Sequence, residues 1–377
     1  MDKNIYEKAA ALRHEIHAHP CLSNQERPTF DTIIAFLKEN TKNIEIMDRG
    51  HYVLARYKAA DPQKGPIAFR ADVDAILVYD DIDKPWKSVI DGVGHKCGHD
   101  GHAACLAALA LQLDQDGADR DVYMIFQPAE ENGTGSAMCT DFLTEFGVEE
   151  IYGFHSQSGA PKYTVMLRDG LYCCASKGMT VTMTGAPAHA SQPEDGLNPS
   201  EAIAKTVLAV SQIADQSRYK GLVLATIVQI DVGEKEAFGV AASKGKLLMT
   251  IRGEIEAEMD LLQRRLEDEA MKNAAEYGLA CEFSYCDAFP ETVSTPACNE
   301  KLRKACDALG YKWWDRPMFY RGSEDFGNFT KVVPGAMFFI SNGLDGECDG
   351  CHTSHFDFND ELIEMVVNIE MELIRTA

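Results

Sequence analysis

The sequence predicts an α/β protein with a mixed, mostly parallel sheet flanked by helices and a smaller α+β insert. Short apolar runs alternate with helical stretches before residue 178 and again after residue 287. Such alternation is typical of a mostly parallel sheet covered by helices. Residues 178–287 follow the order strand, helix, strand, strand, helix, strand, which is the ferredoxin-like arrangement. We therefore expect one domain built from 1–177 and 288–377, interrupted by a second at 178–287.

The first domain is expected to begin with two helices. Residues 4–18 and 28–39 have helical apolar spacing, and Pro20 and Pro28 separate them. Four short runs rich in apolar or β-forming residues follow as predicted strands. They are 53–57, 67–70, 122–126 and 151–154, with a helix at 101–113 between the second and the third.

The insert combines period-two strands with two longer helices. Met179 to Thr184 alternates apolar residues with threonine, which indicates a half-buried strand. The remaining predicted elements are a helix at 199–214, strands at 222–231 and 246–252, a helix at 257–277 and a strand at 280–285. The α/β pattern resumes after Phe289-Pro290.

The net charge of the chain argues against two classes of binding partner. Lys and Arg number 36 against 59 Asp and Glu, a net charge of −23. So acidic a chain is repelled by phosphate backbones and anionic membranes, so we expect neither nucleic acid nor a membrane as partner. No apolar run approaches the ~18 residues that a transmembrane helix needs.

Cysteine content and the N-terminal residues predict the compartment. The twelve cysteines lie in a long chain that begins M-D-K-N-I-Y-E-K, without a basic region followed by an apolar one. A disulfide framework suits short secreted chains, so these cysteines are most simply reduced thiols. We expect a cytoplasmic protein.

The segment G-H-K-C-G-H-D-G-H, residues 94–102, is the densest group of metal-binding residue types. Cys97 and His99 flank a glycine that permits a tight turn, so both side chains can face one point. Thiolate and imidazole suit zinc and other borderline transition metals. Asp100 and His102 are candidates for outer groups that orient the ligands.

Two adjacent carboxylates, Glu130 and Glu131, follow the predicted strand in V-Y-M-I-F-Q-P-A-E-E. On a surface loop such a pair usually only keeps the loop solvated. After a buried strand and a proline turn, one carboxylate can bind metal while the other takes a proton from water.

Further histidines lie at 155 and in the C-terminal C-H-T-S-H-F segment. His155 ends the apolar run I-Y-G-F-H, where a lone histidine is either structural or a ligand. Either His352 or His355 is a candidate ligand. Cys348 to His352 also matches the C-x-x-C-H haem pattern, and Cys348 with Cys351 could form an extra zinc or redox pair.

The insert carries three candidate substrate-contacting residues. His189 and Asn198 lie in the turn-rich segment G-A-P-A-H-A-S-Q-P-E-D-G-L-N-P. Arg252 ends a predicted strand and could bind a substrate carboxylate through two hydrogen bonds, or form only a surface salt bridge.

Together these motifs resemble the dinuclear metal-dependent aminoacylase/carboxypeptidase amidohydrolases, whose catalytic domain is zinc-exopeptidase-like. The subgroup with the greatest similarity comprises hippurate hydrolases, auxin-conjugate amidohydrolases and aminobenzoyl-glutamate hydrolases. The resemblance covers nearly the whole chain. It rests on F-R-A-D-V-D-A, H-K-C-G-H-D-G-H, F-Q-P-A-E-E, F-H, A-P-A-H-A-S-x-P-x-x-G-x-N-P, G-S-E-D-F and H-x-x-x-F, in that order.

The resemblance implies a role for each matched position. Cys97 would bridge two divalent metal ions, zinc or manganese, with cobalt or nickel as alternatives. His99 and His155 would complete the protein ligands of one ion, and Glu131 and His352 those of the other. Glu130 would be the general base and His189 would stabilise the oxyanion. The insert would serve as lid and dimerisation surface of a homodimer, with His189 acting in the same chain or across the dimer.

The expected function is hydrolysis of an N-acyl amino acid to an acid and a free amino acid. A dipeptidase or carboxypeptidase with the same metal chemistry is the alternative within enzymes. A non-catalytic metal-binding protein is the alternative of another class, although such a protein has no use for the spare base of the Glu130-Glu131 pair.

Overall fold

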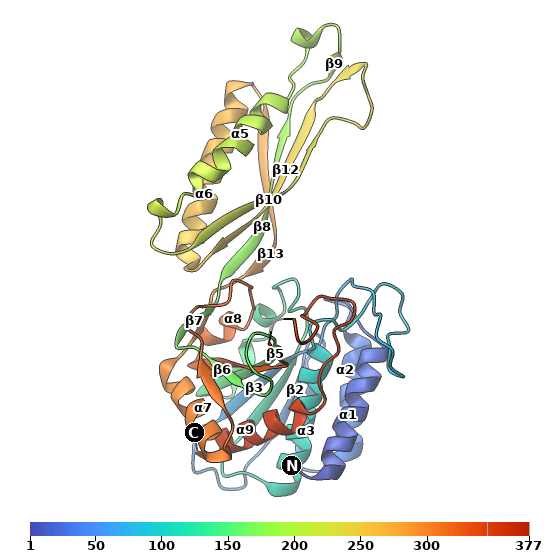
Figure 1. Cartoon of the computed structure of the whole chain (residues 1–377), viewed down its shortest axis with the longest axis vertical. Coiled ribbons are helices and arrows are strands. Elements are labelled where there is room, and N and C mark those ends of the chain that lie inside the picture. Colours follow the sequence, from blue (N-terminus) through green and yellow to red (C-terminus); the bar gives the residue numbers. More distant parts are fainter. Residues whose placement is uncertain (345, 377) are drawn as a thin grey trace. The chain divides into compact units, whose positions relative to one another are not determined.

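The computed structural model describes residues 1–344 and 346–376, which form two compact units (Figure 1). Unit 1 contains Met1–Tyr172, Thr292–Phe319 and the residues from Asp325 on. Unit 2 contains Cys173–Glu291 and Tyr320–Glu324. The insert expected at 178–287 lies within the longer segment of unit 2, whose short second segment the sequence did not indicate.

Unit 1 is built on an eight-stranded mixed sheet with the order β1-β2-β4-β3-β5-β16-β6-β15. Neighbours from β4 to β16 run parallel, whereas β2 runs antiparallel to both of its neighbours, β1 and β4. The strands are β1 (Ile44–Asp48), β2 (Val53–Tyr57), β3 (Ile67–Asp72), β4 (Val122–Gln127), β5 (Glu150–Gln157), β6 (Val165–Leu167), β15 (Trp313–Asp315) and β16 (Gly335–Ser341). The predicted fold class, a mostly parallel sheet flanked by helices, is confirmed.

Helices flank this sheet. They are α1 (Lys3–Ala18), α2 (Arg27–Asn40), α3 (His99–Asp116), α4 (Asp141–Glu145), α7 (Pro296–Leu309), α8 (Gly327–Thr330) and α9 (Leu362–Thr376), with a 3₁₀ turn at Ser136–Met138. Strands β7 (Gly170–Cys173) and β14 (Thr292–Ser294) pair as a separate two-stranded sheet.

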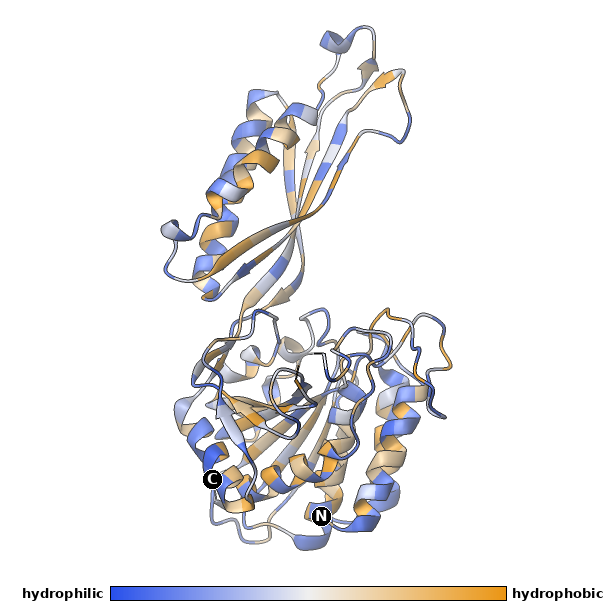
Figure 2. Cartoon of the chain, in the orientation of Figure 1, coloured by the Kyte–Doolittle hydropathy of each residue, from blue (hydrophilic) through white to orange (hydrophobic). Residues whose placement is uncertain are grey.

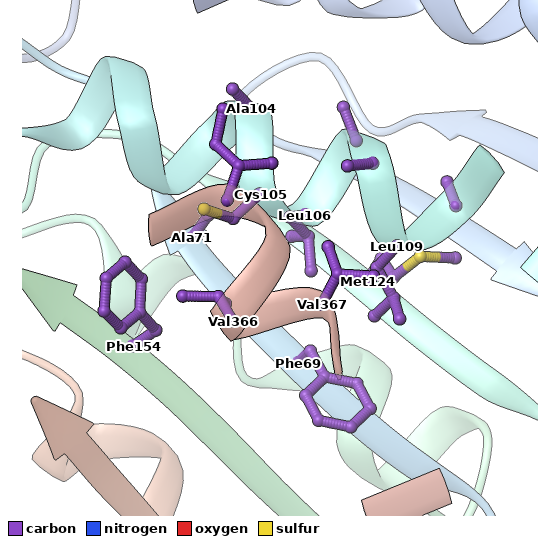
Figure 3. Packing of buried hydrophobic residues seen from close by; sticks show 14 of the residues in the cluster. Phe69, Ala71, Ala104, Cys105, Leu106, Leu109, Met124, Phe154, Val366 and Val367 are labelled. Carbon is purple, nitrogen blue, oxygen red and sulfur yellow. The ribbon is translucent and has the colours of Figure 1, made fainter. Parts of the chain in front are cut away.

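The core of unit 1 lies where α3 and α9 pack on the sheet (Figure 3). Residues 99–113 of α3 are all buried, and the stretch 103–111 is apolar on every side, as expected of a buried helix. The side chains that meet there include Phe69 of β3, Met124 of β4, Cys105 and Leu109 of α3, and Val366 of α9. This packing fixes the N-terminus of α3, which carries the H-D-G-H part of the dense motif.

Unit 2 has a four-stranded antiparallel sheet with the order β10-β12-β8-β13 and two helices. Its elements in chain order are β8 (Ala175–Thr184), α5 (Ser200–Ile213), β10 (Val223–Val232), β12 (Lys244–Gly253), α6 (Glu256–Glu276) and β13 (Ala280–Phe289). Both helices alternate hydrophilic with apolar residues (Figure 2), and their apolar residues join the core over the sheet. The element order and strand order are ferredoxin-like.

Unit 2 also contains a two-stranded pairing of β9 (Ala188–His189) with β11 (Val240–Ala241), and 3₁₀ turns at Pro193–Asp195 and Gln216–Arg218. Across the described parts of both units, none of the helices is long and apolar enough to cross a bilayer.

Candidate metal centre

A left-handed glycine brings Cys97 and His99 to the same side of a turn at the start of α3. Gly98 has φ +98°, and a Cβ placed there would lie 2.8 Å from Ser156 Oγ. A residue with a side chain would therefore be strained and crowded at this position. The C-G-H sequence folds as it does because only glycine fits between the thiol and the imidazole.

Two groups of possible ligand atoms share the Cys97 sulfur. Cys97, His99 and His155 have ligand atoms within 4.8 Å of one another. Cys97, Glu131 and His352 form a second group by the same measure. The candidates come from the turn before α3, α3 itself, β5, the turn after β4 and the loop before α9, so the fold of unit 1 gathers segments far apart in sequence.

The ligand atoms also have the hydrogen-bonding state that a metal requires. His99 Nε2 and Glu131 Oε1 are buried, and neither has a hydrogen-bond partner among the described residues. His99 Nε2 lies 3.7 Å from a carboxylate oxygen of Asp72 and 3.8 Å from one of Glu131. Unpaired buried polar atoms are costly, and a cation among them would remove that cost. Sulfur, imidazole and carboxylate donors suit zinc and other borderline divalent ions.

Hydrogen bonds leave the same ring nitrogen free on the buried His99 and the partly buried His155. His99 Nδ1 lies 3.0 Å from the Asp74 carbonyl oxygen and 3.2 Å from Asp74 Oδ1. His155 Nδ1 donates to the Ser156 carbonyl oxygen at 2.6 Å, so its Nε2, 3.4 Å from Cys97 Sγ, carries the lone pair. Partners of this kind orient the imidazoles of metal-binding histidines.

The two imidazoles differ in charge environment. Burial, reinforced by the neighbouring His102, holds the pKa of His155 well below its usual value. Burial also disfavours protonation of His99, but Asp72 and Asp74 outweigh it and hold the pKa of His99 well above its usual value. The acidic groups around His99 therefore favour a cation at this ring, whereas the His155 ring is already neutral and can offer a lone pair to a metal.

The adjacent carboxylates are held by a strained turn. Ala129 has φ +50°, its N–H donates to the buried Glu26 at 2.8 Å, and the Glu131 N–H donates to Asp74 Oδ2 at 3.0 Å. Glu131 belongs to the second Cys97 group. Glu130 belongs to neither, and its Oε2 lies 3.8 Å from His99 Nε2. The two carboxylates also share a further possible ligand group with His99, so what distinguishes Glu131 is its place in a group with Cys97.

Between the two C-terminal candidates, the structure places His352, not His355, in a ligand group. His352 has φ +67°, and its N–H donates to the Lys96 carbonyl oxygen at 2.6 Å. His352 Nε2 lies 3.5 Å from Glu131 Oε1, and this contact chiefly raises the pKa of His352. The preceding thiol, Cys351 Sγ, lies 3.8 Å from the Cys97 carbonyl oxygen.

Asp100 and His102, expected to orient the ligands, have other direct partners. Asp100 Oδ2 accepts from His17 Nδ1 at 2.7 Å and from Arg13 at 3.3 Å, which ties α3 to α1. His102 Nδ1 lies 2.6 Å from Asp72 Oδ1, and its Nε2 accepts the Ser156 N–H at 3.2 Å. His102 therefore links Asp72 of β3 to Ser156 of β5, and it shares a further possible ligand group with Asp72 and His99.

Sequence reasoning missed Asp74, whose carboxylate and carbonyl both face His99. It also missed Asp72, whose carboxylate contacts His102 and accepts a hydrogen bond from Arg70 Nη1 at 2.6 Å. The available signal was R-A-D-V-D at 70–74, where acidic residues end a fully buried strand.

The candidate substrate residues all belong to unit 2. His189 is exposed on β9, and its Nδ1 lies 2.6 Å from Ser191 Oγ. Asn198 Oδ1 accepts from the N–H and hydroxyl of Ser200 at 2.9 and 2.6 Å, which forms a local turn just before α5. Arg252, on β12, donates to Ser323 Oγ at 2.6 Å.

Comparisons with known proteins agree with this fold. The model of peptidase family M20/M25/M40 matches residues 68–376. An uncharacterized hydrolase of Staphylococcus aureus is 29% identical over 383 residues, covering 98% of both chains. A crystal structure from methicillin-resistant S. aureus aligns with TM-score 0.87 at 22% identity, over 99% of this chain and 96% of the other. A dinuclear metal binding peptidase from Bacillus subtilis aligns with TM-score 0.81 at 24% identity, over 99% and 98%.

Proposed function

Because the chain belongs to peptidase family M20/M25/M40 and is therefore a hydrolase, we propose that it is a dinuclear metal-dependent amidohydrolase of N-acyl amino acids. The observation that carries the proposal is the pair of ligand groups that share the Cys97 sulfur. A thiolate common to two groups suits two adjacent divalent ions. We propose zinc or manganese, with cobalt or nickel as alternatives.

In this proposal each protein group has a separate task. Two bound ions would supply an acidified water and a polarised amide carbonyl. Glu130, outside both Cys97 groups, takes the proton from the water and delivers it to the leaving amine. Asp74 and Ser156 hold the His99 and His155 rings in orientation. His189 stabilises the oxyanion, as the resemblance implies, and Arg252 binds the free carboxylate of the substrate through two hydrogen bonds.

A dipeptide is the second candidate substrate, because the family and the B. subtilis structure are described as peptidases. It requires the same chemistry but also a group that binds the substrate's amine. An assay of N-benzoylglycine beside simple dipeptides, with and without chelator, separates these two substrates. Hydrolysis of dipeptides alone would contradict the N-acyl proposal.

Variants of the adjacent carboxylates test the mechanism. Glu130→Gln should retain two ions per chain and lose turnover by ~10²-fold or more, the usual contribution of a general base. Glu131→Gln should lose metal as well as activity because it removes a ligand. Metal analysis of the same preparations used for kinetics makes the comparison. Near-normal turnover of Glu130→Gln would show that another residue is the general base.

The proposal extends to compartment and assembly. All twelve cysteines are free thiols in the structure, which supports a reducing compartment such as the cytoplasm. We also propose a homodimer formed through unit 2. Its edge strand β10 exposes Val228 and Ile230, 65% and 52% accessible, and an exposed edge can pair with a second copy.

A further inference from the structure

A hydroxyl in the short second segment of unit 2 holds the Arg252 guanidinium. Arg252 Nη1 donates to Ser323 Oγ at 2.6 Å. Ser323 Oγ lies 2.8 Å from Ser176 Oγ and donates to the Cys174 carbonyl oxygen at 2.8 Å. Ser176 is the residue of β8 directly opposite Arg252 in the sheet. The four residues thus form one compact network within unit 2.

The Ser323 hydroxyl has its full complement of hydrogen bonds in this network. Its one proton is used at the Cys174 carbonyl oxygen, so it accepts from both Arg252 and Ser176. A hydroxyl has one donor and two acceptor sites. Its orientation is therefore fixed, and with it the position of Arg252 Nη1.

The backbone places Ser323 independently of its side chain. The Cys174 N–H faces the carbonyl oxygens of Tyr320 and Gly322 at 3.3 and 3.1 Å. Gly322 permits the turn, since a Cβ there would lie 2.0 Å from the Tyr320 ring. Removal of the Ser323 hydroxyl should therefore leave residues 320–324 in place beside Cys174.

Arg252 is partly buried and forms no ion pair with a carboxylate in the part of the chain that the structure describes. Buried cations are normally paired. A guanidinium has five N–H donors, and the network uses only one nitrogen. The remaining edge is suited to a planar anion, and a carboxylate binds it through two parallel hydrogen bonds.

We propose that Ser323 is a positioning residue that orients Arg252 for the carboxylate of the substrate. This inference rests on the proposed function. It adds to the proposed contact between Arg252 and the substrate carboxylate only that the Ser323 hydroxyl sets the direction of the guanidinium. Ser323 itself touches Arg252 and not the substrate.

The test compares two substrates that differ only in that carboxylate, N-benzoylglycine and N-benzoylglycinamide. Ser323→Ala should raise KM for the acid roughly tenfold, the scale of one hydrogen bond to a charged group, and leave kcat and the amide's KM nearly unchanged. Ser323→Thr, which keeps the hydroxyl, should restore the wild-type preference. The matched control is Ser284→Ala, which alters an exposed serine on β13. It should change neither kcat nor KM for either substrate.

A direct binding measurement supports the kinetics. In metal-loaded Glu130→Gln protein, Ser323→Ala should weaken binding of N-benzoylglycine by a similar factor in calorimetry. Metal content and melting temperature should match those of the Glu130→Gln parent. If the alanine variant is unstable, the comparison of Ser323→Thr with Ser323→Cys, which lacks a strong acceptor, replaces it.

The outcomes separate this inference from the proposed function. If Arg252→Ala loses the preference for the acid while Ser323→Ala retains it, the positioning role is overturned and the proposed function stands. If Ser323→Ala impairs acid and amide equally, the role is structural and the inference also fails. If the wild-type enzyme neither binds nor cleaves N-acyl amino acids, the proposed function fails.

Discussion

The Cys97 thiol is the side chain on which the proposed centre depends, because both ligand groups include its sulfur. Cys97→Ser should therefore weaken both ions together. His352→Ala is the matched comparison, since His352 belongs to one group only, and it should release mainly one ion. Elemental analysis after dialysis against a weak chelator measures both. Selective loss of a single ion from Cys97→Ser would show that the sulfur is not shared.

His17 is a second residue whose environment predicts a measurable effect. It lies between Asp100 and Asp80, at 2.7 and 3.2 Å. Burial disfavours its charge, but the two carboxylates outweigh burial and the nearby Arg13, and they raise the pKa of His17 to about 9. The adjacent His95 does not contribute charge in the neutral range, because burial lowers its pKa to about 4.

The sign of the pH effect follows from this shift. An unfolded histidine titrates near 6.5, so between that value and about 9 the folded protein binds more protons than the unfolded chain. The stabilisation is complete below about pH 6.5 and declines as pH rises through the folded pKa, by at most about 3 kcal/mol. Urea unfolding across this range should show the decline in wild type and a flatter profile in His17→Gln. Parallel profiles would contradict the assignment.

The sequence indicated the candidate ligands better than the groups that hold them. Cys97, His99 and Glu131 lie in short motifs with residue types that metals prefer, so local sequence suffices to nominate them. Asp74 contacts His99 across 25 residues of chain, and His17 contacts Asp100 across 83. Such pairs depend on how helices and strands pack, which a local pattern does not record.

At the scale of elements, the sequence indicated the helices and strands before residue 290 better than those after it. The runs at 67–70 and 122–126 correspond to β3 and β4, and the helical spacing at 4–18 and 28–39 corresponds to α1 and α2. After Phe289-Pro290 the sequence indicated only a general α/β pattern, so β16, α7 and α9 were not assigned. It did not indicate β6 and β15, each three residues long, because pairing with neighbours, not local composition, makes them strands. Strand β5 also continues to Gln157, beyond the predicted end at 154, so His155 lies within a strand.

The close approach of α3 to the C-terminal loop gives a prediction about stability. A Cβ at Gly101 would lie 2.2 to 2.4 Å from ring atoms of Phe358, which is itself buried. Gly101→Ala would displace that ring from the core beside Phe154, so we expect a loss of about 1–3 kcal/mol, the usual cost of overpacking. Chemical denaturation measures it. Gly239→Ala, where nothing lies within 4 Å, is the control, and an equal effect of both changes would refute the steric argument.

At the scale of the whole molecule, the proposed machinery is divided between two units. The candidate ligands belong to unit 1, whereas His189, Asn198 and Arg252 belong to unit 2. The sequence predicted an insert because the helix and strand order changes near residue 178. It could not predict that 320–324 joins unit 2, since five residues carry no periodic pattern and their place depends on pairing with Cys173 and Cys174.

The next prediction concerns assembly of the chain. We expect a homodimer through unit 2, because β10 is an edge strand with exposed apolar side chains. Sedimentation should give a dimer mass. The double variant Val228→Lys/Ile230→Lys places charges on that edge and should shift the equilibrium from dimer to monomer. Its circular dichroism spectrum should match that of the wild-type protein. A monomeric wild-type protein at micromolar concentration would refute the proposal.

Mixed dimers then show whether His189 acts in its own chain or in the partner. His189→Ala subunits retain Glu130 and Glu130→Gln subunits retain His189, so each homodimer should have low turnover. If His189 acts across the dimer, the mixed dimer contains one site with both groups and should recover up to half of the wild-type activity. If it acts within its own chain, neither site is complete and mixing restores nothing. Labelled subunits verify exchange, so absence of recovery is itself evidence for the same-chain arrangement.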